Sequence, residues 1–200
     1  FYADPFVWHK NGKHYCFVED YNTKSKKGCI AAIEITADGY KELGVVLEED
    51  FHLSYPFIFE SDGVLYMCPE SHSKKDIRIY RCETFPYVWK LEKVLISNID
   101  AADTNIIFAE GKWWIMTNMC SANMGDHGSE LHIFSSHTLL SEEWTAHAQN
   151  PVIFDPLTAR NGGMLRIDDE FFRVFQKQGF DVYGESSGVA KITLLSDSEY

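Results

Sequence analysis

The sequence predicts an all-β protein, specifically a β-propeller whose blades are four-stranded antiparallel sheets. Three observations support this. Short runs of β-branched and aromatic residues dominate the chain, Gly, Asn and Asp turns separate them, and a hairpin-like segment recurs four times. A repeat of about fifty residues is typical of propeller blades. Because one blade cannot bury its hydrophobic faces alone, the units are expected to stack around a central axis.

The recurring hairpin defines the predicted blades. The four copies read DPFVWHKNGKHYCFVE, YPFIFESDGVLYMCPE, DTNIIFAEGKWWIMTN and NGGMLRIDDEFFRVFQ, starting at Asp4, Tyr55, Asp103 and Asn161. In the first three copies a turn glycine follows eight positions after the start, and Asp169 takes that place in the fourth. The spacing predicts a single domain over residues 1–200, with blades of approximately 1–50, 51–98, 99–152 and 153–200.

Further strands complete each predicted blade. Third-strand segments read GCIAAIEI, DIRIYR, ELHIFS and GVAKITLL, starting at Gly28, Asp76, Glu130 and Gly188. Outer-strand segments read YKELGVVL, WKLEKVL and WTAHAQNPV, starting at Tyr40, Trp89 and Trp144. The repeat leaves open whether four blades close by themselves or a fifth lies outside this chain.

Composition excludes some classes of partner. The chain carries 30 acidic against 18 basic side chains, a formal net charge of −12, which would repel a phosphate backbone. Nucleic acid is therefore not an expected partner. Five cysteines without metal-type spacing are interpreted as reduced thiols. With no apolar stretch long enough to span a bilayer and no basic leader, we expect a cytoplasmic protein, and Phe1 indicates that its natural start is missing.

Polar residues recur at both ends of each hairpin, and these ends share one rim of a blade. Fifteen residues separate the two members of each pair, which are Asp4 and Glu19, Tyr55 and Glu70, Asp103 and Asn118, and Asn161 and Gln176. Because the innermost strands line a propeller channel, these eight side chains and His72 would converge on a hydroxyl-rich ligand such as a carbohydrate. In the alternative interpretation, they satisfy backbone groups and water around a wet channel.

The histidines show no spacing typical of metal ligands. An H-x-x-x-H or similar pattern is missing, so the sequence predicts no protein-bound transition metal and no cofactor. A calcium or sodium ion on the propeller axis is left open.

Two resemblances sharpen the prediction. The opening ADPF and the hairpin after it resemble the first blade of the five-bladed propellers of glycoside hydrolase family 43 and its arabinanase, levansucrase and invertase relatives. Most of the chain more closely resembles another group. Three segments carry this resemblance: HLSYPFIFESDGVLYMCPES from His52, RIYRCETFPYVWKLEKVL from Arg78 and RNGG from Arg160. That group is the propeller-like domain of the glucosamine inositolphosphorylceramide transferase family and its bacterial relatives.

The hydrolase resemblance implies catalytic roles. It assigns a general base to Asp4 and an orienting, pKa-tuning role to Asp103. At the fourth-blade position of the general acid this chain has Arg160 and Asn161, neither of which protonates a leaving oxygen near neutral pH. Glu70 is the provisional acid and is preferred over Glu19. Inverting hydrolysis needs about 6.5–9.5 Å between the two carboxyl groups, and the position of Glu70 in the second blade leaves room between it and Asp4.

Three functions stay open at this point. The first is an enzyme that hydrolyses or transfers a glycosyl group. The second is a non-catalytic propeller that binds a carbohydrate or glycoconjugate and serves a fused or associated glycosyltransferase; its ligand contacts would be Asp4, Tyr55, Asp103, Arg160, Asn161 and Gln176. Arg160 would suit a carboxylate or phosphate on that ligand. The third is a protein-interaction propeller that binds through apolar outer faces.

Overall fold

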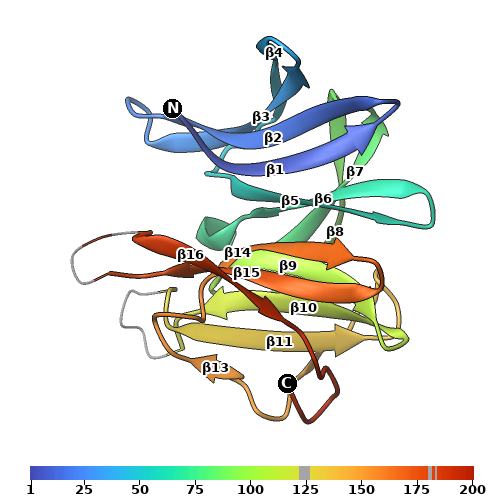
Figure 1. The fold of residues 1–200 in the computed structure, drawn as a ribbon, viewed down its shortest axis with the longest axis vertical. Coiled ribbons are helices and arrows are strands. Elements are labelled where there is room, and N and C mark those ends of the chain that lie inside the picture. The colour runs from blue at the N-terminus through green and yellow to red at the C-terminus, as the bar shows by residue number, and fades with distance from the viewer. Residues whose placement is uncertain (122–126, 180–181, 183) are drawn as a thin grey trace. The chain divides into compact units, whose positions relative to one another are not determined.

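The protein is almost entirely β-structure in the computed structural model, which describes residues 1–121, 127–179, 182 and 184–200. Sixteen strands form four antiparallel sheets, and the only helix in these described ranges is the short 3-10 helix η1 (His72–Lys74) (Figure 1). The predicted all-β class is confirmed. The chain divides by packing into two compact units, residues 1–97 and 98–200, which are described separately; the single domain stays a prediction.

The first unit holds two four-stranded sheets, each in simple sequential order. The first sheet comprises β1 (Tyr2–Lys10), β2 (Lys13–Asn22), β3 (Lys27–Thr36) and β4 (Gly39–Leu47). The second comprises β5 (Ser54–Ser61), β6 (Val64–Glu70), β7 (Asp76–Thr84) and β8 (Val88–Ser97). Both sheets have the strand number and order of the predicted blades.

The second unit holds two sheets that depart from this pattern. The third sheet comprises β9 (Ala101–Ala109), β10 (Lys112–Met119), β11 (Glu130–Ser136) and two short strands, β12 (Thr145–Ala146) and β13 (Ile153–Phe154), which both pair with β11. The fourth comprises β14 (Asn161–Ile167), β15 (Glu170–Lys177) and β16 (Ser186–Lys191). It therefore has three strands within the described residues.

The third sheet has no continuous outer strand because a side chain replaces part of it. Asn150 places its amide against the backbone of Ile133, accepting the Ile133 N–H at 2.8 Å and donating to the Ile133 carbonyl at 2.8 Å. The two short strands flank this contact. The outer strand that the sequence predicts from Trp144 is thus split, and the amide of Asn150 bridges the gap between its parts.

The hairpin turns explain why the repeat was visible in the sequence. In the first hairpin both turn residues, Asn11 and Gly12, have positive φ angles of 52° and 74°. This conformation matches the twist of the flanking strands and favours an Asn-Gly pair. Asp62 with Gly63, and Glu110 with Gly111, adopt nearly the same pair of angles. The register of three of the four hairpins is therefore set by local turn chemistry.

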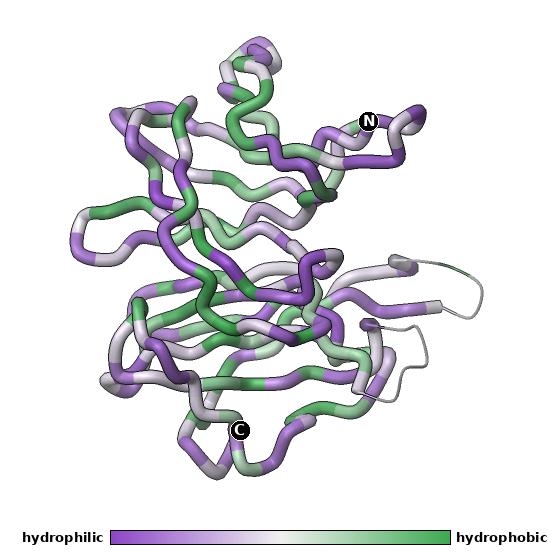
Figure 2. Tube along the Cα trace, turned by 180° about the vertical axis from the view of Figure 1, so that it is seen from behind, coloured by the Kyte–Doolittle hydropathy of each residue, from purple (hydrophilic) through white to green (hydrophobic). Residues whose placement is uncertain are grey.

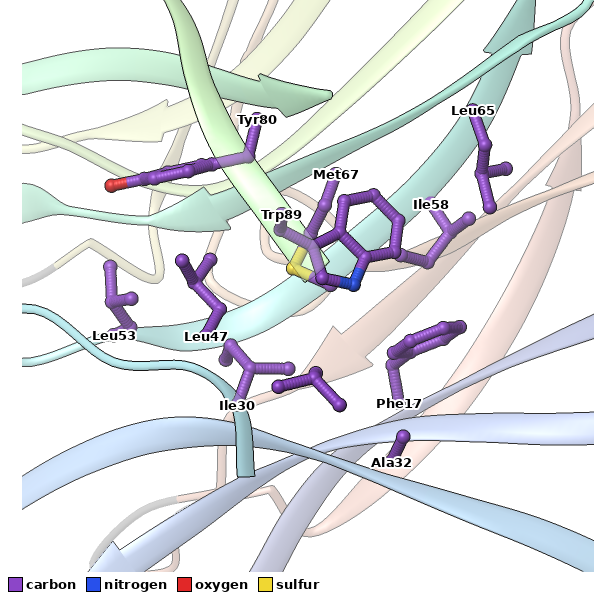
Figure 3. Close-up of a cluster of buried hydrophobic side chains, with 11 residues drawn as sticks. Phe17, Ile30, Ala32, Leu47, Leu53, Ile58, Leu65, Met67, Tyr80 and Trp89 are labelled. Carbon is purple, nitrogen blue, oxygen red and sulfur yellow. The ribbon is translucent and has the colours of Figure 1, made fainter. Parts of the chain in front are cut away.

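Aromatic and aliphatic side chains between the two sheets of the first unit make its core (Figure 3). Phe17 of β2 meets Trp89 of β8 edge to face, with ring centroids 5.5 Å apart. The indole N–H of Trp89 donates to the carbonyl of Pro86 at 2.8 Å, so its one polar group is satisfied on burial. These contacts hold together the strands whose ends carry the candidate site.

The core of the second unit is centred on Trp114, which is 1% exposed and packs with Met116, Leu131 and Ile133. In both units hydrophobic and hydrophilic stretches alternate along the chain (Figure 2). The five cysteines, all of which lie in described ranges, are free thiols. No helix in the described part of the chain is long and apolar enough to cross a membrane.

Candidate functional site

The innermost strand of three sheets begins with the same strained bulge. Asp4, Tyr55 and Asp103 have φ angles of 48°, 45° and 48°, in the left-handed region that glycine normally occupies. Each lies at a register shift where two residues of the inner strand oppose one residue of its partner. Such a conformation costs about 1–3 kcal/mol in a non-glycine residue and occurs most often at functional sites.

The fourth sheet differs at the equivalent place. Its register shift falls between Asn161 and Gly163, and the positive φ of 129° belongs to Gly163. Asn161 therefore keeps an ordinary backbone conformation. The four hairpin starts that look equivalent in the sequence form three strained positions and one relaxed one.

Four of the predicted site residues gather in the first unit. We call the group formed by Asp4, Glu19, His52, Glu70 and His72 the first cluster. Asp4 accepts a hydrogen bond from the backbone N–H of Tyr55 at 3.2 Å, which ties β1 to β5. Glu19 lies 3.6 Å from His52 Nε2, and Glu70 lies 3.5 Å from His72 Nδ1. Three carboxyl groups and two imidazoles thus share one end of the unit.

Glu19 is a buried acid of this cluster with a raised pKa. Its residue is 7% exposed. Burial raises the pKa of Glu19 to about 7, with further contributions from the negative charges of Asp4 and Glu70. Near neutral pH a substantial fraction of Glu19 therefore holds its proton and acts as a hydrogen-bond donor.

His52 and Gly28 fix the surroundings of Glu19. The backbone N–H of Gly28 donates to His52 Nδ1 at 2.8 Å, so in the neutral ring the proton sits on Nε2, toward Glu19. Burial lowers the pKa of His52, which favours this neutral form. A Cβ on Gly28 would lie 2.5 Å from the Leu53 carbonyl and 2.7 Å from Glu19 Oε1. Gly28 is therefore required for the close approach.

The Tyr55 side chain is buried, whereas the sequence predicts that it faces a ligand at the rim of the channel. It is only 2% exposed, and its ring meets Phe6 edge to face at a centroid distance of 4.8 Å. The observed link between Tyr55 and the first cluster is its backbone N–H, bonded to Asp4. A ligand contact by the Tyr55 side chain stays a prediction.

The other five predicted site residues gather in the second unit, and we call Asp103, Asn118, Arg160, Asn161 and Gln176 the second cluster. Its centre is an ion pair in which Arg160 Nε donates to Asp103 Oδ2 at 2.7 Å. The two side chains are 15% and 4% exposed. Here the carboxylate is paired directly with a guanidinium, whereas the negative charges of Asp4 and Glu70 raise the pKa of Glu19.

The two asparagines of the second cluster use their amides inside the protein. Asn118 donates to the carbonyls of Glu130 and Ala159, both at 2.9 Å, and accepts from Asn161 N–H at 2.8 Å. Asn161 donates to the carbonyls of Asp103 and Met116, at 2.8 and 3.0 Å. Both are 0% exposed. This arrangement gives them a structural role, and ligand binding by either stays a prediction.

Gln176 and Arg173 hold the backbone on either side of Asn161. Gln176 Nε2 donates to the Asn161 carbonyl at 2.7 Å, and its own N–H donates to the Arg160 carbonyl at 2.9 Å. Arg173, 1% exposed, donates to the carbonyls of Thr158 and Ala159 and to Asn161 Oδ1. The backbone that carries Arg160 is therefore rigidly held.

Sequence reasoning missed a further polar group beside the second cluster. Glu130, 5% exposed, accepts hydrogen bonds from Ser121 and from His132 Nε2, the latter at 2.9 Å. Burial acts to raise the pKa of Glu130, but these hydrogen bonds outweigh it and the pKa lies below its ordinary value. The only sequence signal was the polar start of the recurring ELHIFS segment.

The structure therefore gathers the predicted residues into one group within each unit. Asp4, Glu19, Glu70 and His72 belong to the first, with Tyr55 attached through its backbone. The catalytic assignments to Asp4, Asp103 and Glu70 stay predictions. The connections from β10 to β11 and from β15 to β16 include residues 122–126, 180, 181 and 183, which lie outside the described residues.

Comparison with solved structures establishes the fold. A family 43 glycoside hydrolase of a Bacteroides ovatus xyloglucan locus superimposes with a TM-score of 0.72 at 14% identity, covering 98% of this chain and 41% of that one. An α-L-arabinofuranosidase from Lactobacillus brevis gives 0.70 at 14% identity, covering 98% and 73%. These likenesses confirm the β-propeller fold of the family 43 type.

Comparison of sequences establishes the family. Glucosamine inositolphosphorylceramide transferase 1 from Oryza sativa subsp. japonica is 34% identical over 207 residues, and the protein of that name from Arabidopsis thaliana is 34% identical over 205. All of this chain is matched, but it spans only 27% and 26% of those relatives. The family model for the N-terminal region of glucosamine inositolphosphorylceramide transferase 1 matches residues 1–200, so the chain belongs to that family.

Proposed function

We propose that this chain is a carbohydrate-binding propeller module and that the first cluster provides its ligand contacts. The observation that carries the proposal is the gathering of Asp4, Glu19 and Glu70 beside two imidazoles, with Glu19 buried and its pKa near 7. The names of the relatives support it, since the family relatives are called glucosamine inositolphosphorylceramide transferase 1 and the similar folds include an α-L-arabinofuranosidase. Both names refer to sugar chemistry.

The first cluster has the donors and acceptors that a sugar requires. Each hydroxyl of a sugar both donates and accepts a hydrogen bond. The carboxylates of Asp4 and Glu70 accept such bonds, whereas protonated Glu19 donates. His72, whose side chain is 46% exposed, adds a group at the solvent side. A polyol therefore matches this cluster better than a uniformly charged ligand does.

A second candidate function, glycosyl hydrolysis or transfer, is favoured by one specific observation. A general acid needs a pKa near the working pH, and burial beside other carboxylates is the usual way to raise it. Glu19 has such a pKa, so in this candidate Glu19 replaces Glu70 as the acid opposite the base Asp4. The Asp103–Arg160 ion pair supports binding without catalysis, because it leaves Asp103 a fixed, charge-compensated group.

Binding is tested by titrating the isotope-labelled chain with a panel of monosaccharides, including glucosamine, arabinose and galactose, and following backbone amide shifts by NMR. We expect shifts at the ends of β2 and β6, and their loss in Asp4→Asn and Glu19→Gln. Glu60→Gln is the matched control, because Glu60 is an exposed residue on β5 outside the cluster. Unchanged binding in both cluster variants would contradict the proposal.

Catalysis is tested separately with aryl glycosides. If the chain turns over, Asp4→Asn should abolish the rate and Glu19→Gln should lower it by about 100-fold or more, as expected for loss of a general acid. Glu70→Gln decides between the two candidate acids. A large loss of rate in Glu70→Gln, with the rate retained in Glu19→Gln, would assign the general acid to Glu70. Sugar binding without turnover would support the binding function and reject the catalytic one.

A further inference from the structure

The tip of the first hairpin places two histidines directly opposite each other. The two-residue turn at Asn11 and Gly12 fixes the register, so that Lys10 pairs with Lys13 and His9 with His14. In a hairpin of this kind the residues next to the turn form the hydrogen-bonded pair. The following pair is then not hydrogen-bonded, and its side chains lie closest together.

The two imidazoles are close enough to share an ion. Their Nδ1 atoms lie 3.4 Å apart, and their ring centroids are 4.7 Å apart with planes inclined at 57°. Two nitrogen ligands held at 2.0–2.1 Å from one zinc ion at a tetrahedral angle would be about 3.3 Å apart. Both histidines are exposed, so an ion can reach the pair from solvent and keep water at its remaining positions.

We propose that His9 and His14 form a binding site for a divalent transition-metal ion such as Zn²⁺, Cu²⁺ or Ni²⁺, each histidine coordinating through Nδ1. Without metal, one Nδ1–H donates to the other Nδ1. On binding, that ring moves its proton to Nε2, so both Nδ1 lone pairs become available. Imidazole nitrogen ligands favour these metals over Mg²⁺ and Ca²⁺, which prefer oxygen.

The neighbouring lysines do not oppose the ion from the same side. Side chains alternate across a strand, so Lys10 and Lys13 lie on the opposite face of the sheet from His9 and His14. On that face Lys10 Nζ lies over the Phe85 ring, 4.7 Å from its centroid, and Lys13 Nζ binds Glu34 at 2.6 Å. Their positive charges therefore point away from the histidine pair.

The pair is separate from the first cluster. His9 is five residues from Asp4 along β1, about 17 Å at the rise of an extended strand. In the described part of the chain no group of three or more histidine, cysteine or acidic side chains is arranged to hold a metal ion. The site therefore supplies two protein ligands and keeps open positions, and its ion would join β1 to β2 at their turn.

The test is calorimetric titration of the chain with Zn²⁺, using His9→Asn, His14→Asn and the control His137→Asn. His137 is exposed and lies in the second unit. We expect wild type and the control to bind alike and each pair variant to bind at least about tenfold more weakly, because half the protein ligands are lost. No Zn²⁺ binding by wild type, or equal binding by all four proteins, would overturn the proposal.

A spectroscopic measurement checks the ligand set without relying on the variants. Electron paramagnetic resonance of the wild-type chain with one equivalent of Cu²⁺ should show coupling to two imidazole nitrogens. Affinity should also fall as the pH is lowered, since protons compete for the ligand nitrogens. Coupling to a single nitrogen in wild type would reject the shared site.

Discussion

The two clusters differ in how they treat a buried carboxyl group. In the first, Glu19 is surrounded by the acids Asp4 and Glu70 and holds a proton near neutral pH. In the second, Asp103 is paired with Arg160 at 2.7 Å, and the surrounding amides are bonded to backbone carbonyls. A buried acid beside other acids responds to pH, whereas one paired directly with a guanidinium fixes the structure.

This contrast bears on function. A group whose proton is held loosely can donate to a ligand or exchange a proton with it, so the first cluster is suited to chemistry or selective binding. Side chains that are saturated within the protein are suited to holding strands. The predictions below test whether the division is as sharp as the contacts indicate.

The largest effect is expected from Arg160→Met. This change removes the guanidinium from beside Asp103, whose side chain is 4% exposed. We expect a loss of about 3–5 kcal/mol in the free energy of unfolding, measured by urea denaturation. Arg160→Met combined with Asp103→Asn should recover much of it. A loss below about 1 kcal/mol for the single variant would mean that the ion pair is not what holds the second cluster.

The next effect concerns Gly28→Ala. The added Cβ would lie 2.5 Å from the Leu53 carbonyl, a backbone atom that cannot easily move. We expect about 3 kcal/mol of destabilisation in the same urea assay. Gly162→Ala is the control, because its Cβ would meet the movable side chains of Val174 and Gln176 at 3.2 and 3.4 Å. Equal losses in both variants would contradict the close approach between Gly28 and the Leu53 carbonyl.

A smaller effect is the pH dependence that Glu19 creates. Its folded pKa of about 7 is higher than the ordinary value of 4.5, so the folded state binds the proton more tightly than the unfolded state. The contribution is therefore lost as pH rises between about 4.5 and 7, by up to about 3 kcal/mol. Urea denaturation across this range should show the fall in wild type and a flatter profile in Glu19→Gln. Matching profiles would show that Glu19 titrates normally.

The smallest effect separates two contacts of His52, the hydrogen bond that it accepts from Gly28 N–H and its 3.6 Å approach to Glu19. His52→Asn can retain an acceptor for Gly28 N–H, whereas His52→Gln can retain a donor toward Glu19. We expect the pKa of Glu19, followed by carboxyl ¹³C shifts, to rise in the Asn variant and to change less in the Gln variant. A larger rise in the Gln variant than in the Asn variant would show that the hydrogen bond from Gly28 to residue 52 controls the pKa of Glu19.

The hairpin repeats were readable from the sequence because turn chemistry is local. Asn11–Gly12 and its counterparts mark the repeats directly. The sequence spacing pairs Asp4 with Glu19. In the structure Glu19 lies opposite Ala3, one residue earlier on β1. The cause is the bulge at Asp4, which the sequence conceals because the left-handed residue is not glycine.

Contacts between distant segments could not be read in the same way. His52 joins Glu19 only because the link before β5 passes Gly28, and the Asn118 amide is held only because the carbonyls of other segments approach it. The histidine pair lies outside the H-x-x-x-H pattern for a related reason. That spacing brings two ligands together on one face of a helix, whereas His9 and His14 meet across a turn.

The amide of Asn150 has a consequence for solubility. A strand at the margin of a sheet offers unpaired backbone groups on which another chain can assemble. On β11 that margin is occupied by β12, by β13 and, between them, by Asn150 at Ile133. The Asn150 side chain thus covers the backbone of β11 between the two short strands, where another chain could otherwise add a strand.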